Sequence, residues 1–279
     1  TEVCARHFGD RVKHWMVMNE PSVFTGAGYF LGVHAPGKTG LSNYLKAVHH
    51  ATLATAASGR ALRTILPQAN IGTTFSCTHV EPASQSPRDM AAAKRADALL
   101  NRTFLEPLLG LGYPQADIPI LRKMDRYRLA NDDRHLPFDF DFIGLQCYTR
   151  EVVKASYFTP YIHASLVKAE KRKVPTTEMK WEVYPPSIYE VIKKFNAYPN
   201  IPRIIMTENG AAFPDQLVDG QINDVQRRRY IQDHLRQVLR AKEEGYHTRF
   251  GLIHINYETQ QRIVKQSGLW YGRFLAGDC

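Results

Sequence analysis

Short apolar runs alternate with longer amphipathic segments along this chain. The alternation of strand-length and helix-length segments is typical of parallel βα units, so we expect an α/β fold with a single domain over residues 1–279. The segment 150–180 has neither period and is expected to be a long irregular insertion. The apolar runs predict buried strands at 14–19, 71–76, 138–148 and 203–207, and the amphipathic segments predict helices at 44–66, 86–109, 186–198 and 223–244.

Two of the predicted strands end on a glutamate. Glu20 precedes Pro21 after the run WMVMN, and Glu208 precedes an Asn-Gly turn after the run IIMT. In a parallel α/β barrel the carboxyl ends of the strands form the catalytic face, so the two glutamates can converge across one cleft. Two carboxylates in one cleft are the minimum requirement for cleaving a glycosidic bond. One protonates the leaving oxygen, and the other attacks the anomeric carbon or activates water.

Each glutamate also has a purely structural interpretation. Glu20 beside Pro21 is typical of a helix start, and Glu208 is typical of a solvated strand end before a turn. The pair, taken with the sequence around each glutamate, is more informative than either glutamate alone.

Composition and charge narrow the function classes. The 279 residues are 44% hydrophobic and 23% charged, an ordinary globular composition, and no apolar run reaches the roughly 18 residues of a membrane span. The net charge of +9 permits nucleic-acid binding, but the basic runs 168–173 and 227–229 lie among acidic or polar residues. This interleaving favours a solvated surface, so no nucleic-acid or membrane partner is expected.

The cysteines and histidines do not predict a metal site or a cofactor. Cys4, Cys77, Cys147 and Cys279 have no close spacing typical of metal or redox motifs, so we expect reduced thiols and a cytoplasmic location. The histidines also lack the spacing of ligands. The chain starts without a signal peptide and without Met, so the true N-terminus is expected to lie upstream.

Sequences around both glutamates resemble the signatures of glycoside hydrolase family one, the β-glucosidase and β-galactosidase family. FGDRVKHW at 8–15 leads into NEP at 19–21, and TENG occupies 207–210. DFIGLQCYT at 141–149 is similar to the sixth barrel strand of the family, and WEVYP at 181–185 is similar to a motif on its aglycone side. The resemblance implies a (β/α)8 TIM barrel and hydrolysis of terminal β-D-glycosidic bonds.

The resemblance assigns the chemistry to the two glutamates. Glu20 would be the general acid/base, and Glu208 would be the nucleophile of a retaining double displacement. Retention requires the two carboxyl groups to lie about 5–5.5 Å apart. The acid must stay protonated near neutral pH, so burial and the nearby nucleophile should raise the pKa of Glu20.

Four further residues are implied in substrate binding. Asn19 would bond the sugar 2-hydroxyl, Tyr148 would donate to the nucleophile, and Trp181 would stack on the aglycone. Gln146 departs from the usual Asn, and its additional methylene alters a side chain that contacts the acid/base in the family. The structural alternatives are a strand-end amide for Asn19, a half-buried strand tyrosine for Tyr148 and a core residue for Trp181.

The resemblance covers nearly the whole chain but not the whole family pattern. The first three βα units are expected to be absent, as is an eighth strand with its loop near residues 244–246. We therefore expect a partial (β/α)8 barrel that retains about four parallel strands. Its open edges would need an oligomer or a complementing chain to cover them.

Two functions follow from the sequence. The first is a β-glucosidase-like enzyme that acts on a β-glucoside or an oligosaccharide. The alternative is a catalytically impaired remnant or a carbohydrate-binding fragment of the same family.

Overall fold

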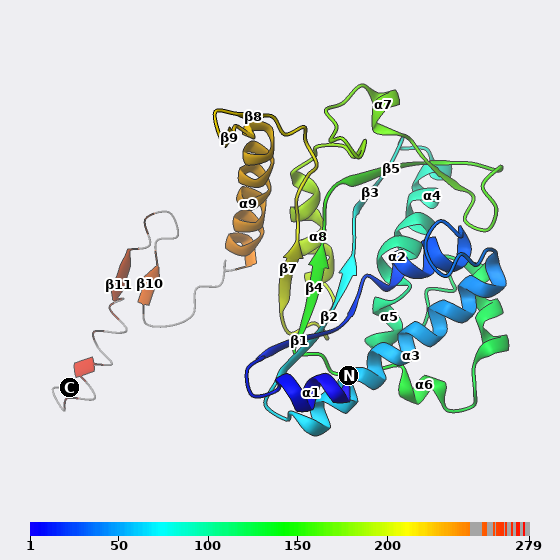
Figure 1. Ribbon diagram of the computed structural model, residues 1–279, viewed down its shortest axis with the longest axis horizontal. Coiled ribbons are helices and arrows are strands. Elements are labelled where there is room, and N and C mark those ends of the chain that lie inside the picture. The colour runs from blue at the N-terminus through cyan, green and yellow to red at the C-terminus, as the bar shows by residue number, and fades with distance from the viewer. Residues whose placement is uncertain are drawn as a thin grey trace.

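Four parallel strands form the centre of the structure, which is a computed structural model. It describes residues 1–245, 253–255, 259, 261–264, 266, 269, 272–273 and 276. The strand order is β1-β2-β4-β7 (Figure 1). This order confirms the parallel α/β arrangement and the four predicted strands. Their bounds are His14–Asn19 for β1, Asn70–Ser76 for β2, Phe142–Gln146 for β4 and Ile204–Glu208 for β7.

Strand β4 is shorter than the predicted 138–148. The residues before it serve the neighbouring elements instead, because Asp141 accepts a hydrogen bond from the backbone N–H of Ile71 at 2.7 Å. The rings of Phe138 and Phe140 pack edge to face at 4.8 Å. A backbone hydrogen bond of 2.8 Å from Asp141 N–H to the Ile71 carbonyl also links this part of the apolar run to β2, although the regular strand starts only at Phe142.

The prediction of an irregular segment at 150–180 is wrong in part. Strand β5 (Arg150–Ala155) pairs in parallel with β3 (His79–Pro82) and antiparallel with β6 (Ala164–Leu166) in a second sheet, and helix α7 (Ala169–Arg172) follows. These strands are short, and the sheet is stabilised by the pairing of β5 with a strand far away in the sequence. Local periodicity therefore carries no signal for them.

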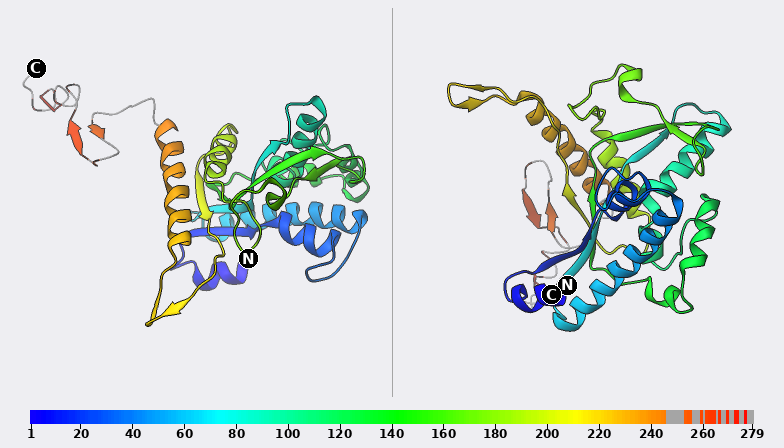
Figure 2. Two further views of the ribbon diagram at one scale, coloured as in Figure 1. Left: turned by 90° about the horizontal axis from the view of Figure 1, so that it is seen from above. Right: turned by 45° about the vertical axis from the view of Figure 1, so that its right-hand side comes forward.

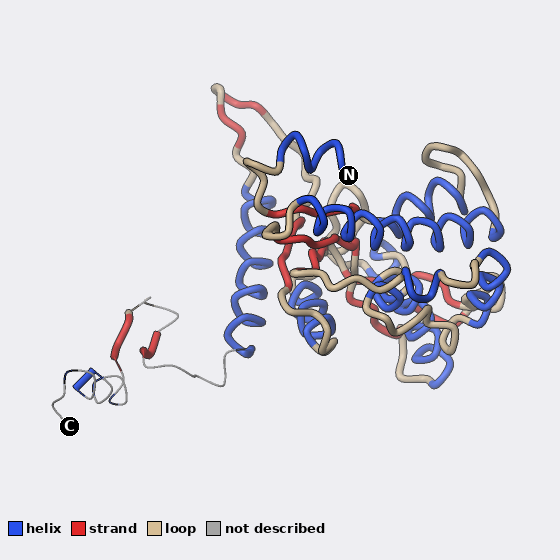
Figure 3. The backbone as a smooth tube through the Cα atoms, turned by 90° about the horizontal axis from the view of Figure 1, so that it is seen from below, coloured by secondary structure: helices blue, strands red, loops and turns tan. Residues whose placement is uncertain are grey.

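Helices surround the central sheet (Figure 3). The predicted helix at 86–109 is divided into an α-helix, a π-helical turn and a short α-helix. The helical elements are α1 (Glu2–Phe8), α2 (Pro21–Thr25), η1 (Gly26–Phe30), α3 (Leu41–Ile65), α4 (Pro87–Asp97), η2 (Ala98–Arg102), α5 (Leu105–Leu108), η3 (Pro119–Tyr127), α6 (Asp132–His135), α8 (Pro186–Asn196) and α9 (Val225–Gly245). Two antiparallel pairs complete the described elements: β8 (Leu217–Val218) with β9 (Gln221–Ile222), and β10 (Ile253–Ile255) with β11 (Arg262–Val264).

The outer face of the sheet packs against helices α3 and α8 and forms the main hydrophobic core. Ile71 and Phe75 on β2 and Ile143 and Leu145 on β4 are buried at alternate positions. They belong to the same cluster as these helix residues: Leu45, Val48, Leu62, Ile188, Val191 and Phe195. Burial of this face holds the strand ends of the central sheet in place.

Toward the carboxyl ends of the strands, the inner face of the sheet carries small and polar side chains. Thr74 of β2 and Thr207 of β7 share a hydrogen bond of 2.8 Å across Gly144 of β4. Met16 on β1 is 54% exposed. The described strands do not close into a barrel, because β1 and β7 each pair with one neighbour in this sheet.

The expected loss of an eighth strand near 244–246 concerns a region that lies largely outside the described residues. Of the helices that the structure describes, none has both the length and the apolar character needed to cross a membrane.

Candidate active site

The carboxyl ends of the four central strands bring polar residues together at one edge of the sheet. Asn19 ends β1 and is followed by Glu20, while Ser76, Gln146 and Glu208 end β2, β4 and β7. The strand pairing shifts register just before the ends of β1 and β7. Such irregularities bend a strand and re-aim its side chains, and here they precede both glutamates.

Glu20 adopts a left-handed backbone conformation, with φ of 44° and ψ of 57°. This conformation is uncommon for a residue with a side chain. Hydrogen bonds hold it, because Glu20 N–H donates to the Thr74 carbonyl at 3.1 Å and Val23 N–H donates to the Glu20 carbonyl at 2.9 Å. Backbone strain of this kind is concentrated at functional sites.

The surroundings of Glu20 favour its protonated form. Burial raises the pKa of Glu20, and the negative charge of Glu208 raises it further, while a side-chain hydrogen bond with Ser76 opposes them. The electrostatic effect of Glu208 indicates that the two carboxyl groups lie close enough to interact. A carboxyl group that keeps its proton to higher pH is suited to general acid chemistry.

Both oxygens of the Glu208 carboxylate accept a hydrogen bond. Gln146 Nε2 donates to Oε1, and the Tyr148 hydroxyl donates to Oε2. Burial raises the pKa of Tyr148, and the hydrogen bond to Glu208 and its charge raise it further. The phenol therefore remains a donor at neutral pH, and Glu208 is held in one orientation.

Gln146 connects Glu208 to β1. It is fully buried, and its Nε2 also donates to Asn19 Oδ1 at 2.7 Å. The side chain of Gln146, which is one methylene longer than the Asn usual in the family, thus contacts both Asn19 and Glu208. Its Oε1 is buried and has no hydrogen-bond partner among the described residues.

A second set of hydrogen bonds supports the strand end that carries Glu208. The side-chain amide of Asn209 donates to the Cys147 carbonyl at 2.7 Å and to the Tyr230 hydroxyl at 3.2 Å. The Tyr230 hydroxyl donates to the Tyr148 carbonyl at 2.7 Å. Helix α9 thereby fixes the ends of β4 and β7 relative to each other.

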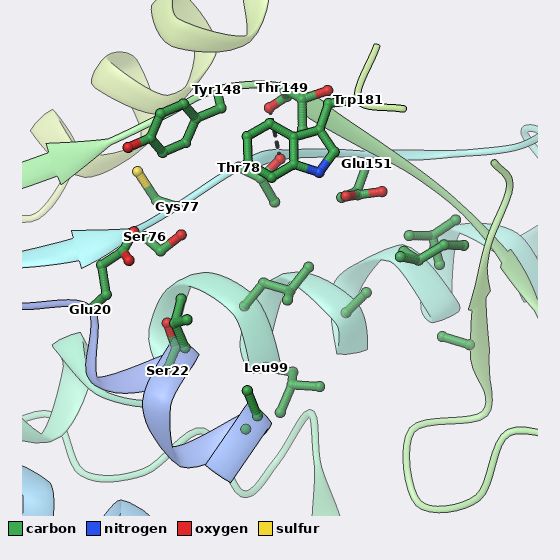
Figure 4. A pocket seen from close by; sticks show the side chains of 18 of the residues that line it. Glu20, Ser22, Ser76, Cys77, Thr78, Leu99, Tyr148, Thr149, Glu151 and Trp181 are labelled. Atoms are coloured by element: carbon green, nitrogen blue, oxygen red, sulfur yellow. Dashed lines mark hydrogen bonds between the residues drawn. The ribbon is translucent and has the colours of Figure 1, made fainter. Parts of the chain in front are cut away.

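Trp181 lies beside Tyr148, with ring centroids 5.4 Å apart, and is 38% exposed. Together with Glu20 and Tyr148 it lines a cavity of about 660 Å³ (Figure 4). Glu208 does not line this cavity. The cavity therefore extends from the Glu20 side of the site.

Buried ion pairs hold the segment that carries Trp181. The Glu182 carboxylate accepts two hydrogen bonds of 2.9 Å from the Arg150 guanidinium and one of 2.6 Å from Arg172. Thr149 donates to the Glu182 carbonyl at 2.9 Å. These contacts join the Trp181 segment to β5 and stabilise this wall of the cavity.

The structure brings all of the sequence-predicted site residues to the same end of the sheet. It also adds Ser76 and Glu151, which the sequence analysis did not identify. Ser76 ends a predicted strand, so its position at this edge of the sheet was predictable in the same way as that of Glu20. Glu151 lies on the unpredicted β5 and had no such signal.

A metal site does not form here from the residues that the structure describes. No group of three His, Cys, Asp or Glu side chains within them is arranged to hold an ion. The side chains gathered at the strand ends are carboxylates, amides, a phenol and a hydroxyl.

Comparisons with known proteins agree with this arrangement. Residues 1–246 match the sequence model described as "Glycosyl hydrolase family 1". The chain is 34% identical to "Beta-glucosidase A" of Thermotoga maritima, with 97% of this chain and 65% of the relative covered. It is 33% identical to "1,4-beta-D-glucan glucohydrolase" of Thermotoga neapolitana, with 99% and 66% covered.

The structure is similar to that of a β-glucosidase from Thermotoga maritima in complex with deoxynojirimycin. The TM-score is 0.82 at 32% identity, and the alignment covers 99% of this chain and 66% of the other. The chain thus spans about 65% of the length of the first relative.

Proposed function

Because the chain belongs to glycosyl hydrolase family 1, we propose that it hydrolyses terminal β-D-glucosidic bonds by a retaining double displacement. The observation that carries the proposal is the pair of glutamates at strand ends, with the charge of Glu208 raising the pKa of Glu20. The substrate is a β-glucoside, in line with the names of the relatives.

In the first step, the Glu208 carboxylate attacks the anomeric carbon. The bond from this carbon to the leaving oxygen breaks, and Glu20 transfers its proton to that oxygen. The products are a glycosyl ester on Glu208 and a free alcohol. Hydrogen bonds from Gln146 and Tyr148 orient the attacking carboxylate.

In the second step, water replaces the alcohol. The Glu20 carboxylate takes a proton from water, and the resulting oxygen attacks the anomeric carbon and breaks the ester. The sugar leaves with retained configuration, and both glutamates return to their starting states. Asn19 Oδ1 accepts from Gln146, so its Nδ2 is oriented to donate to the sugar 2-hydroxyl.

The two roles can be separated with two isosteric variants. Glu208→Gln removes the nucleophile, and we expect it to lower kcat by at least about 10³-fold on every β-glucoside. Glu20→Gln removes the acid, which an activated leaving group does not need. It should therefore form the glycosyl ester from p-nitrophenyl β-D-glucoside much faster than from an alkyl β-D-glucoside.

Burst kinetics and intact-mass measurement of the ester on the Glu20→Gln variant would check this. Equal losses by both variants on both substrates would contradict the assigned roles.

A second candidate is a carbohydrate-binding fragment that needs a complementing chain for turnover. The observation that favours it is the pair of sheet edges at β1 and β7, since each strand has one neighbour in the central sheet. This candidate predicts that glucosides bind without being hydrolysed. Calorimetric titration of the chain with p-nitrophenyl β-D-glucoside, alongside product release, distinguishes the two.

Two further expectations remain part of the proposal. We treat residues 1–279 as a single incomplete barrel domain. We also propose a cytoplasmic location, which is supported by the free thiols of Cys4, Cys77 and Cys147.

A further inference from the structure

The cavity beside Glu20 continues past Tyr148 and Trp181 between helix α4, the π-helical turns and the second sheet. Figure 4 shows Glu20 at one end and Glu151 on the far side of Trp181. Its walls are mostly hydrocarbon, and among the residues that contribute are Val23, Leu99, Val153, Ile162 and Leu166. A volume of about 660 Å³ is within the range of small-molecule sites.

The threonine hydroxyl groups on these walls already donate hydrogen bonds to backbone carbonyls of the protein. The Thr78 hydroxyl donates to the Thr149 carbonyl at 2.8 Å, and the Thr149 hydroxyl donates to the Glu182 carbonyl at 2.9 Å. A second sugar in this cavity would bury hydroxyl groups against carbon. Burying polar groups without hydrogen bonds is unfavourable, so the cavity suits an apolar group better than a sugar.

Glu151 is the exception on the far wall. Among the described residues its carboxyl group has no hydrogen bond and no ion pair, although it lies in a cavity with apolar walls. The nearby Arg172 guanidinium is engaged by the Glu182 carboxylate at 2.6 Å and by the Val167 carbonyl at 3.2 Å. A donor on a bound molecule would therefore meet an available carboxyl group.

We propose that the leaving group of the substrate is an apolar alcohol rather than a second sugar, and that Glu151 accepts a hydrogen bond from a donor on its far end. The proposal rests on the proposed function, because the cavity begins at the candidate acid Glu20. It distinguishes this chain from an enzyme for β-linked glucans, and it makes Glu151 a specificity-determining residue.

Binding of non-hydrolysable thioglucosides tests the cavity without turnover. Calorimetry with S-alkyl β-D-glucosides from butyl to decyl should show the Kd falling about fourfold for each added methylene until the cavity is filled. Thiocellobiose should bind more weakly than the octyl compound. A Kd that is independent of chain length, or tighter binding of thiocellobiose, would overturn the proposal.

Filling the cavity gives a matched comparison. Leu99→Trp places an indole in the cavity and should weaken binding of the octyl compound at least tenfold. Leu111→Trp is the control, because Leu111 is exposed and lies outside the cavity lining. Leu166→Trp at the exposed rim gives a second test if the first variant fails to fold. Unchanged binding by folded cavity variants would contradict the proposal.

The role of Glu151 is tested with the same alkyl series carrying a terminal hydroxyl. At the best chain length the native chain should prefer the hydroxylated compound about tenfold over its plain partner. Glu151→Leu should reverse the preference, whereas Glu151→Gln should retain part of it through its amide oxygen. An unchanged preference in Glu151→Leu would remove Glu151 from the proposal.

The two proposals fail in different ways. The chain could bind the alkyl series with the expected dependence on length but fail to hydrolyse p-nitrophenyl β-D-glucoside. This result would support the cavity proposal and contradict the proposed hydrolase activity. Conversely, the chain could hydrolyse this substrate while its Kd for the S-alkyl β-D-glucosides does not depend on the length of the alkyl group. This result would support the hydrolase activity and contradict the cavity proposal.

Discussion

At the residue scale, the site depends on the different surroundings of its two carboxyl groups. Glu208 accepts from Gln146 and Tyr148, whereas Glu20 is partly buried and has a raised pKa. Two carboxyl groups in different environments can perform different roles in one reaction. In the proposed mechanism, the division between acid and nucleophile therefore follows from the neighbours of each glutamate.

Ser76 is the neighbour that moderates the pKa of Glu20. Because its hydrogen bond favours the carboxylate, Ser76→Ala should raise the pKa of Glu20 further. The protonated acid would then persist to higher pH, and the alkaline limb of kcat/KM should move upward. The acidic limb should stay in place.

The pH profile of p-nitrophenyl β-D-glucoside hydrolysis would measure this shift. Ser84→Ala is the control, since Ser84 bonds Asp89 at 2.6 Å and does not line the cavity. An alkaline limb that moves downward in Ser76→Ala would contradict the expected sign.

At the element scale, the central sheet is packed tightly just below the site. Gly144 lies between Thr74 and Thr207, and a Cβ at this position would meet atoms of both threonines at 2.9 Å. The two threonines are joined by a hydrogen bond, so neither can move away without losing it. Because Gly144 has no side chain, Thr74 of β2 and Thr207 of β7 can meet across β4 on the inner face of the sheet.

Gly144→Ala should lower the free energy of unfolding by about 1–3 kcal/mol through overpacking. Gly26→Ala is the matched control, because a Cβ there has open space and the backbone is right-handed helical. Urea denaturation of both variants would test the difference. Equal stability of Gly144→Ala and the native chain would show that the threonines can adjust.

At the scale of the whole molecule, helix α9 leaves a row of apolar side chains exposed among charged residues. Ile231, Leu235 and Leu239 repeat every fourth residue on α9 and are 42%, 57% and 55% exposed. Figure 2 shows α9 at one end of the sheet, beyond β7. Residues four apart lie on one face of a helix, and exposed apolar side chains gathered on one face favour association.

We expect the isolated chain to self-associate with rising concentration. Replacing Leu235 and Leu239 together by Lys should shift the sedimentation coefficient toward that of the monomer. Val3→Lys is the control, because Val3 is exposed at the opposite end of the chain, on α1. A native chain that remains monomeric at every concentration would contradict this expectation.

The sequence by itself determined the central elements and the principal candidates for chemistry. The strands ending at Asn19 and Glu208 were predictable because apolar periodicity is local, and the glutamates followed because strand ends gather at one edge of a parallel sheet. The surrounding motifs indicated the family. These signals each occupy a short stretch of chain, so sequence reasoning can detect them.

Only the tertiary structure decided how these residues meet. The register shifts before Glu20 and Glu208, the contacts of Gln146 with Asn19 and Glu208, and the second sheet that carries Glu151 all join segments distant in sequence. Such pairings depend on long-range packing, and one residue of register changes which face a side chain occupies. For this reason the apolar cavity beside Glu20 could not be predicted from the chain alone.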